Sequence, residues 1–200
     1  MTAPTGSDKE LWQLVQANDR HAFGVLFERH AEAVYNYSFR RTADWAAAED
    51  LVSSVFLEAW RRRADLELTS QSERLLPWLL GVATNLLRTR NRSAARLARA
   101  LLRERTGSDE PDFADDAVRR VADAQRMKAV LSLIRALPRG TQDVLALYAW
   151  AGLSYEEVSA SLGIPIGTVR SRLSRARLYL EKLEPVIVPR KESEVPNEAW

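Results

Sequence analysis

The sequence predicts an all-α protein with two small helical domains joined by a flexible acidic linker. Apolar residues recur at three- and four-residue steps along most of the chain, and no segment shows a convincing alternating β pattern. The 200 residues are 46% apolar, which is enough for one large domain or two small ones. Between the helical stretches, Thr106–Asp116 contains Gly, Pro and five acidic residues, a composition typical of a linker.

The first domain is expected over residues 8–105 as a bundle of three or four helices. The first helix carries His30 on the same face as a set of apolar residues: Phe23, Leu26, Phe27, Val34 and Tyr37. The second begins after Asp44, a good N-cap, and has the apolar stripe Leu51, Val52, Val55, Phe56 and Ala59. The third begins near Pro77, which a first helical turn tolerates, and continues through Leu79, Leu80, Ala83, Leu86 and Leu87.

The end of the first domain is strongly basic. Seven arginines and a single acidic residue, Glu104, give residues 88–105 a local charge of +6. Such a run can be a solvated helix end, where the helix dipole favours cations, or it can contact nucleic-acid phosphates. Nucleic-acid contact is the preferred interpretation because a DNA-reading motif follows on the same chain.

A linker is expected over residues 106–123 and the second domain over residues 124–183. Helical spacing resumes through Val130 and Leu131 and stops at Pro138, and a further helix is expected from Gln142 to Trp150. The tail, residues 184–200, contains three prolines. It is either loose or a small docking segment with apolar anchors at Val186, Ile187, Val188 and Trp200.

Residues 153–180 have the pattern of a helix-turn-helix. Ser154 and Glu157 have the spacing of a capping box, and Gly163 suits a left-handed helix end. In the second helix, an apolar stripe of Val169, Leu173, Ala176 and Leu180 is expected to face the first helix. The residues left facing outward are Arg170, Ser171, Arg172, Ser174, Arg175 and Arg177. Arginine can bind guanine edges or phosphates, so this helix is expected to bind DNA rather than to be only a solvated basic face.

Three segments resemble, in this order, the signature segments of extracytoplasmic-function (ECF) sigma factors, the compact two-domain members of the bacterial sigma-70 family. They are AEDLVSSVFLEAWRRR (48–63), PWLLGVATNLLRTRNR (77–92) and LSYEEVSASLGIPIGTVRSRLSRAR (153–177). The resemblance covers about residues 10–183. It implies that residues 8–105 are similar to sigma domain 2, which docks on RNA polymerase and reads the promoter −10 element. It also implies that residues 124–183 are similar to sigma domain 4, which reads the −35 element.

The resemblance implies roles for individual residues. Contact with the β′ clamp of the polymerase is implied for Glu49, Asp50, Leu51, Phe56 and Leu57. Recognition of the −10 element is implied for Arg61, Asn85, Arg88, Arg92 and Arg96. Recognition of the −35 element is implied for Thr168, Arg170, Ser171, Arg172, Ser174, Arg175 and Arg177. Thr168 is near the helix start, where backbone N–H groups can meet a phosphate. The loop Asp65–Arg74 matches the loop that captures an extruded base, but it contains no aromatic residue.

The sequence therefore predicts an RNA polymerase sigma factor that recognises promoters and helps to melt them. The implied partners are core RNA polymerase, through the β′ clamp and the β flap, promoter DNA, and an anti-sigma factor. The alternative is a stand-alone helix-turn-helix regulator with a helical sensor domain, which would bind a palindromic site as a dimer.

Enzymatic activity and membrane insertion are not expected. The chain has no cysteine and only two histidines, which excludes thiol nucleophiles, thiolate metal sites and His-rich metal sites, and no cofactor is expected. His30 lies on an apolar helix face and is expected to be a core residue rather than an acid–base group. The N-terminus lacks the layout of a signal peptide, and the longest apolar stretch, Leu75–Ala83, is about half of the ~18 residues of a membrane span. A cytoplasmic protein is expected.

Overall fold

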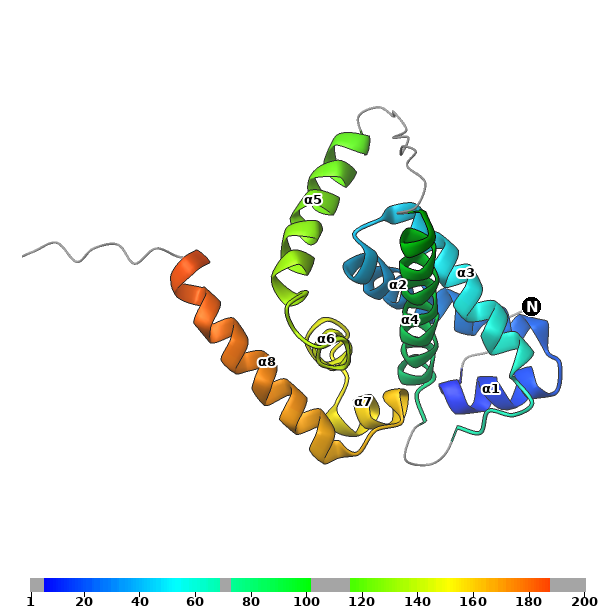
Figure 1. Ribbon diagram of the computed structural model, residues 1–200. Helices are drawn as coiled ribbons and strands as arrows, with labels where there is room; N and C mark the ends of the chain where they lie inside the picture. Colours follow the sequence, from blue (N-terminus) through cyan, green and yellow to red (C-terminus); the bar gives the residue numbers. More distant parts are fainter. Residues whose placement is uncertain (1–5, 69–72, 102–115, 188–200) are drawn as a thin grey trace, which may run out of the picture.

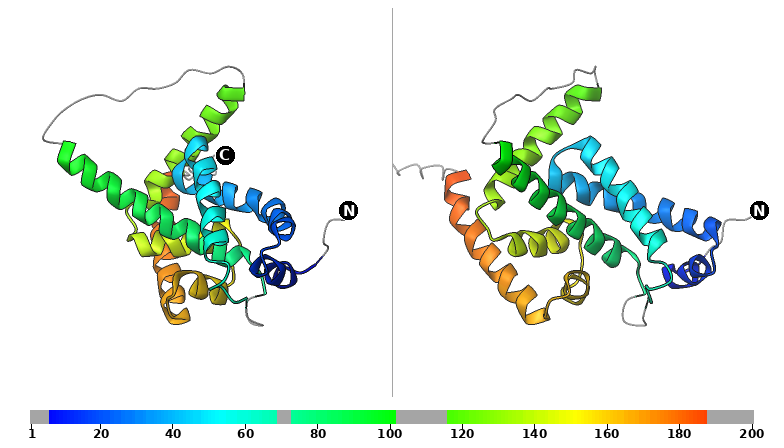
Figure 2. Two further views of the ribbon diagram at one scale, coloured as in Figure 1. Left: turned by 90° about the vertical axis from the view of Figure 1, so that its right-hand side faces the viewer. Right: turned by 45° about the vertical axis from the view of Figure 1, so that its right-hand side comes forward.

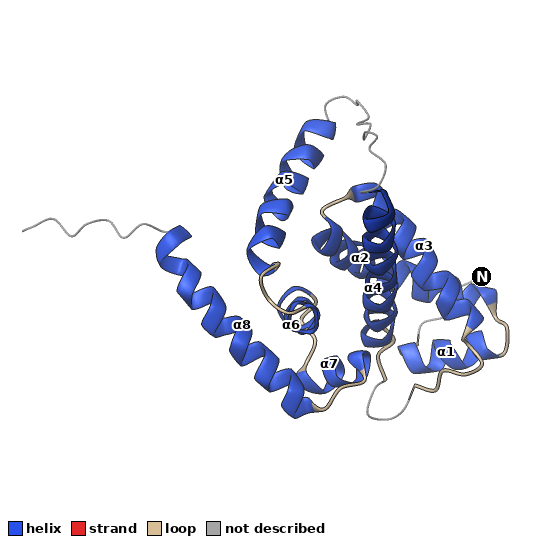
Figure 3. Cartoon of the chain, in the orientation of Figure 1, coloured by secondary structure: helices blue, strands red, loops and turns tan. Residues whose placement is uncertain are grey.

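The computed structural model describes residues 6–68, 73–101 and 116–187, and these ranges contain helices and no strands (Figures 1 and 3). The helices are α1 (Asp8–Gln16), α2 (Arg20–Thr42), α3 (Trp45–Arg61), α4 (Leu76–Leu101), α5 (Asp116–Ile134), α6 (Arg139–Leu145), the π-helix η1 (Ala146–Trp150), α7 (Tyr155–Leu162) and α8 (Ile166–Ile187). The predicted all-α class is confirmed. Most of the predicted linker and the end of the tail lie outside the described residues.

The N-terminal half, α1 to α4, packs around an apolar core. Fully buried side chains from three different helices meet there, among them Leu26, Val55 and Leu79. Asp44 caps α3 as predicted, because its carboxylate accepts a hydrogen bond from the Ala47 N–H at 3.0 Å. The sequence pattern did not single out α1. Its buried Trp12 donates through the indole N–H to the Leu66 carbonyl at 2.9 Å, which ties α1 to the segment after α3.

The C-terminal half, α5 to α8, packs directly on the N-terminal half. Val144, Leu147 and Val158 are fully buried and belong to the same continuous apolar cluster as the core of α2, α3 and α4. In Figures 1 and 2, α6 and α7 lie between α4 on one side and α8 on the other. A second, smaller cluster of Ile134, Leu137 and Ala176 joins the end of α5 to α8.

Two helices extend into the segments assigned to the linker and the tail. Residues 116–123, assigned to the linker, form the start of α5. Trp45 of α3 holds this part of α5, because its indole N–H donates to the Arg120 carbonyl at 3.0 Å and the Arg120 guanidinium lies 5.9 Å from its ring centroid. Residues 184–187, assigned to the tail, continue α8.

Asp8 forms a buried junction between α1, α2 and the start of α4. Its side chain is 8% exposed and accepts hydrogen bonds from Arg29 Nη1 at 2.8 Å and from the Leu75 N–H at 2.7 Å. The second carboxylate oxygen also lies 2.9 Å from His30 Nε2. Burial alone would raise the pKa of Asp8, but the hydrogen bonds from His30, Leu75 and Arg29 outweigh it and lower the pKa from 3.8 to about 2.

Asp8→Asn is therefore expected to lower the free energy of unfolding at pH 7 by about 2 kcal/mol. Because the folded-state pKa is depressed, this stabilisation is present above about pH 4 and is lost as the pH falls from about 4 to 2. Urea unfolding at several pH values measures it. The control is Glu28→Gln, at an exposed position of α2. Equal unfolding energies for Asp8→Asn and the wild type at pH 7 would contradict the expectation.

Candidate nucleic-acid interface

Helix α8 presents a basic and polar face next to the helix-turn-helix turn. The capping box of α7 forms as predicted, with Ser154 Oγ accepting from the Glu157 N–H at 3.1 Å and the Glu157 carboxylate accepting from the Ser154 N–H at 2.9 Å. Gly163 ends α7 in the left-handed conformation, with φ of 62°. Val169 and Ala176 are fully buried, so the apolar side of α8 packs inward. The exposed side carries Arg170, Ser171, Ser174, Arg175 and Arg177.

Two predicted DNA contacts on α8 are placed differently. Arg172 is half-buried and donates to the Gly140 carbonyl at 3.3 Å, so it faces α6 rather than outward. Its spacing explains this, because Arg172 is three residues after Val169 and four before Ala176, on the buried side of the helix. The Thr168 N–H donates to the Pro165 carbonyl at 2.8 Å, so this N–H is not available to a phosphate.

Helix α4 presents a second polar face. Asn85, Arg92 and Arg96 are exposed, and intervals of seven and four residues place them within about 40° of one another around the helix. Trp78, seven residues before Asn85, falls on the same face and is half-buried. The sequence prediction does not include Trp78 in this site, although its seven-residue spacing from Asn85 places both residues on one face of a helix. Arg61, the last residue of α3, is exposed as well.

Arg88 lies at the edge of this face, where its Nη1 donates to Asn85 Oδ1 at 3.3 Å, and its side chain also reaches the C-terminal half. Its Nε donates to Asp143 Oδ2 of α6 at 2.8 Å. Asp143 is 2% exposed and also accepts from Arg41 Nη2 of α2 at 2.6 Å. Arg41 in turn lies beside the buried Tyr37, whose hydroxyl is 2.7 Å from Thr84 Oγ1 and whose pKa is raised above 10 by burial. In this arrangement Arg88 binds a carboxylate through Nε and remains 29% exposed, and its contact with DNA stays a prediction.

A cavity of about 240 Å³ adjoins the polar face of α4. Its walls include Trp78 and Asn85 of α4, Arg62 and Glu67 from the segment after α3, and Ser161 of α7. The Arg62 guanidinium lies 6.0 Å from the Trp78 ring centroid. Aromatic rings and guanidinium planes are the surfaces on which extruded bases stack. Trp78 of α4 provides an aromatic ring in a cavity that also has Glu67 of the loop after α3 in its wall.

Helix α3 has an exposed face of acidic and apolar side chains. Glu49, Asp50 and Leu57 are exposed, as a protein contact requires, and Leu57 is 49% exposed. Leu51 and Phe56 are buried and pack into the core, so they are not part of the exposed face, and their contact with polymerase stays a prediction. Phe56 packs edge-on against Phe27 of α2, with ring centroids 4.7 Å apart.

Phe27 extends this apolar surface onto α2. It is 41% exposed although its spacing placed it on the predicted core stripe. Phe27 and Phe56 pack edge-on at the edge of the core, and only Phe27 is exposed there, which the sequence pattern does not show.

His30 is 8% exposed and hydrogen-bonded to Asp8, as expected of a core histidine. Within the described ranges, no three His, Asp or Glu side chains come together in a way that could hold a metal ion. None of the described helices is both long and apolar enough to cross a membrane.

Family comparisons match both halves of the chain. The model of Sigma-70 region 2 matches residues 26–97, and the model of Sigma-70, region 4 matches residues 127–180. The sigma factor CarQ of Myxococcus xanthus is 32% identical over 165 residues, which are 81% of this chain and 88% of CarQ. The ECF sigma factor SigK of Mycobacterium ulcerans is 29% identical over 88% of this chain and 94% of SigK. The probable sigma factor RfaY of Xanthomonas campestris is 31% identical, and the match spans 80% of this chain and 40% of RfaY.

A solved structure has the same fold. The structure of CnrH in complex with the cytosolic domain of CnrY matches 90% of this chain and 99% of CnrH, with a TM-score of 0.65 and 24% identity. The residues matched by the region 2 model include the polar face of α4, and those matched by the region 4 model include α7 and most of α8. The chain therefore belongs to the sigma-70 family of RNA polymerase sigma factors and is of the extracytoplasmic-function type.

Proposed function

We propose that this chain directs core RNA polymerase to promoters by reading a −35 element with α8 and a −10 element with α4. The observation that carries this proposal is the pair of polar, basic faces on α4 and α8, one in each family region. Each face alone would bind DNA weakly. Because the two faces are on one chain, the second contact becomes effectively intramolecular and the pair is selective.

At the −35 element, the N-terminal part of α8 would enter the major groove, as recognition helices do. Arg170 and Arg175 are exposed and long enough to bind guanine with two hydrogen bonds, and Ser171 and Ser174 can bond to bases or phosphates. Arg177 lies farther along the helix and is assigned to the phosphate backbone. Arg172, which faces α6, is not part of this surface.

At the −10 element, Asn85, Arg92 and Arg96 would contact the strands, and the cavity beside them would hold an extruded base. Extruding a base costs a few kcal/mol, so the cavity must supply stacking and hydrogen bonds in return. Trp78 and Arg62 offer stacking surfaces, and Asn85 and Glu67 offer donors and acceptors. Arg61, exposed at the end of α3, is assigned to the phosphates.

Trp78→Ala is expected to reduce the rate of promoter opening about fivefold or more, since one base–aromatic stack is worth ~1–3 kcal/mol. Trp78→Phe keeps an aromatic ring and is expected to retain most of the rate. Permanganate reactivity of −10 thymines in the polymerase holoenzyme measures opening. Trp78 also lies 6.5 Å from Trp12, so unfolding is measured in parallel. If the Trp78→Ala protein is folded and opens promoters at the wild-type rate, Trp78 is not part of the site that holds the extruded base.

Docking on core polymerase is assigned to the exposed face of α3 together with Phe27 of α2. Synthesis of RNA belongs to the polymerase, and this chain contributes recognition. A solved relative, RpoE of Bartonella quintana, was crystallised with the anti-sigma factor NepR. A regulatory partner of that class is proposed for this chain as well.

The function is tested by adding the purified chain to core RNA polymerase, isolating the complex, and sequencing the promoter fragments that it transcribes. Transcription from promoters with two elements, dependent on both proteins, is the expected result. The alternative, a stand-alone regulator, predicts a palindromic site bound without core enzyme. Failure to bind core enzyme would reject the proposed function.

A further inference from the structure

We propose that Trp12 and Gln16 of α1 are positioning residues for the cavity beside Trp78 and Asn85, which we call the base cavity, and this proposal rests on the proposed role of that cavity in holding an extruded base. Among the described residues, those that line the base cavity belong to α4, to α7 and to the segment after α3. Helix α1 lies outside its wall and acts on it only through the residues that it holds.

The main-chain carbonyl of Leu66 receives two hydrogen bonds from α1. The indole N–H of Trp12 donates to it at 2.9 Å, and Nε2 of Gln16 donates to it at 3.0 Å. The two donors are four residues apart and therefore lie on the same face of α1, one turn from each other. Trp12 is 1% exposed and Gln16 is half-buried, so water competes little for either bond. Because Leu66 lines the base cavity, both bonds fix the main chain at its wall.

The residue after the end of α1 adds a third tie to the same segment. Asn18 adopts a left-handed conformation, with φ of 69°, and its side-chain oxygen accepts hydrogen bonds from Nε and Nη2 of Arg63. The segment after α3 is thus held from α1 and its C-terminal end at two points, Arg63 and Leu66. Each of these points is next in sequence to a residue of the cavity wall, Arg62 in one case and Glu67 in the other.

The segment held by α1 separates two cavities. Glu67 and Leu68 line the base cavity, and they also line a cavity of about 270 Å³ that has Trp12 and Gln16 in its wall. An unfilled space provides no atomic contacts that oppose movement into it. The side chains of Leu66 and Leu68 pack partly against the core, but space remains on the α1 side. The hydrogen bonds to the Leu66 carbonyl therefore restrain the segment where packing does not.

Trp12 also contacts the aromatic part of the base cavity. Its ring lies 6.5 Å from the ring of Trp78, measured between centroids, and the two planes are tilted by 47°. One buried side chain of α1 thus packs beside the stacking ring on α4 and hydrogen-bonds to the segment after α3. A base can stack and form hydrogen bonds together only if these two parts of the wall are correctly spaced, and displacements of about 1 Å are costly in such sites.

The test measures the rate of promoter opening by the polymerase holoenzyme carrying Gln16→Ala, which removes one donor and leaves Trp12 in place. Opening is expected to be about three- to fivefold slower, the range that the loss of one side-chain hydrogen bond accounts for. Gln16→Glu keeps the shape of the side chain but its carboxylate does not donate, so a similar loss is expected. Gln13→Glu, at an exposed position of α1, makes the same charge change and should open promoters at the wild-type rate.

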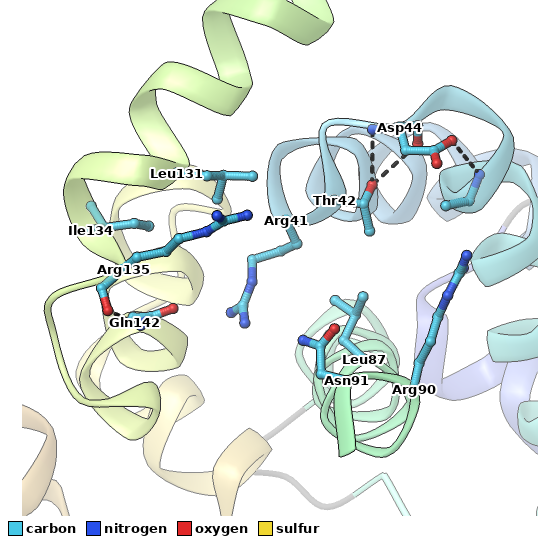
Figure 4. A pocket seen from close by; sticks show the side chains of 11 residues that line it. Arg41, Thr42, Asp44, Leu87, Arg90, Asn91, Leu131, Ile134, Arg135 and Gln142 are labelled. Atoms are coloured by element: carbon cyan, nitrogen blue, oxygen red, sulfur yellow. Dashed lines mark hydrogen bonds between the residues drawn. The ribbon is translucent and has the colours of Figure 1, made fainter. Parts of the chain in front are cut away.

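Gln142→Ala is the matched control for lost stability. Gln142 is also half-buried, and its Nε2 donates to the Leu137 carbonyl at 2.7 Å. It lies in the wall of a different cavity, of about 300 Å³, which is lined by residues of α2, α4, α5 and α6 (Figure 4). Its loss should lower the free energy of unfolding about as much as Gln16→Ala does, and promoter opening should stay at the wild-type rate.

A double variant separates positioning from an independent role. If Gln16 acts through the base cavity, Gln16→Ala combined with Trp78→Ala should open promoters no more slowly than Trp78→Ala alone, whereas independent effects would multiply. Multiplied effects would overturn the positioning role, as would a wild-type rate for Gln16→Ala or an equal loss in Gln142→Ala. In those cases a slow Trp78→Ala protein would still support the base cavity. Wild-type opening by folded Trp78→Ala would instead overturn the role of the base cavity, and the positioning role with it.

Discussion

Asp50→Ala combined with Leu57→Ala is expected to weaken binding to core RNA polymerase at least about thirtyfold while leaving the fold intact. Both side chains are exposed on the same side of α3, two turns apart, and neither contributes to the buried core. Leu57 is 49% exposed, and burying this exposed apolar surface against a partner gains apolar contact. Truncating the central residues of an interface costs ~2 kcal/mol or more, which corresponds to about thirtyfold in affinity.

The comparison is made by titrating labelled protein with core enzyme and by thermal unfolding of each variant. The matched control is Leu14→Ala combined with Glu32→Ala, which removes one exposed leucine and one exposed acid from α1 and α2. Unfolding temperatures of the wild type and both double variants should agree closely. Wild-type affinity of the Asp50/Leu57 variant would place the docking surface away from α3.

Helix formation in this chain depends largely on residues that are close together in the sequence, and most of the helices could therefore be predicted. The caps at Asp44 and Ser154, the proline in the first turn of α4 and Gly163 after α7 each satisfy or release backbone groups within a few residues. Helix α1 escaped prediction because it is nine residues long, too short for a strong periodic signal. The start of α5 was assigned to the linker because its contact with Trp45 is 75 residues away in sequence.

For the candidate site, the sequence pattern does not determine which side chains are exposed and which are buried. The apolar stripe of α8 predicts which side of the helix is exposed. The prediction places Arg172 on that side because it is an arginine, whereas its spacing from Val169 and Ala176 puts it on the inner side. Phe56 was assigned to a contact and Phe27 to the core, because a pattern does not show which member of an aromatic pair reaches the surface. Asp143 was not singled out at all. A lone aspartate in a short helix becomes informative only when the fold brings Arg41 and Arg88 to it.

Arg175→Ala is expected to cost about 1–3 kcal/mol on the −35 element that the holoenzyme selects, which is about five- to 150-fold in affinity. The loss should shrink on promoters changed at the base pair that Arg175 contacts. Arg175 is exposed, about 100° around α8 from the buried Ala176 and within the N-terminal half of the recognition helix, and this position allows its guanidinium to reach a base edge.

Substitution of three arginines on α8 distinguishes three roles, which are contact with a base, contact with a phosphate and contact within the protein. Arg177→Ala, at the proposed phosphate contact, should weaken binding uniformly across sequences and reduce the slope of log affinity against log salt by about one. Arg172→Ala removes a side chain that faces Gly140, so it should change neither sequence preference nor salt slope. Because the three substitutions delete the same side chain and charge, differences among them report position and not net charge. A uniform loss for Arg175→Ala, with a reduced salt slope, would make Arg175 a phosphate contact, and base recognition at the −35 element would then depend on Arg170, Ser171 and Ser174.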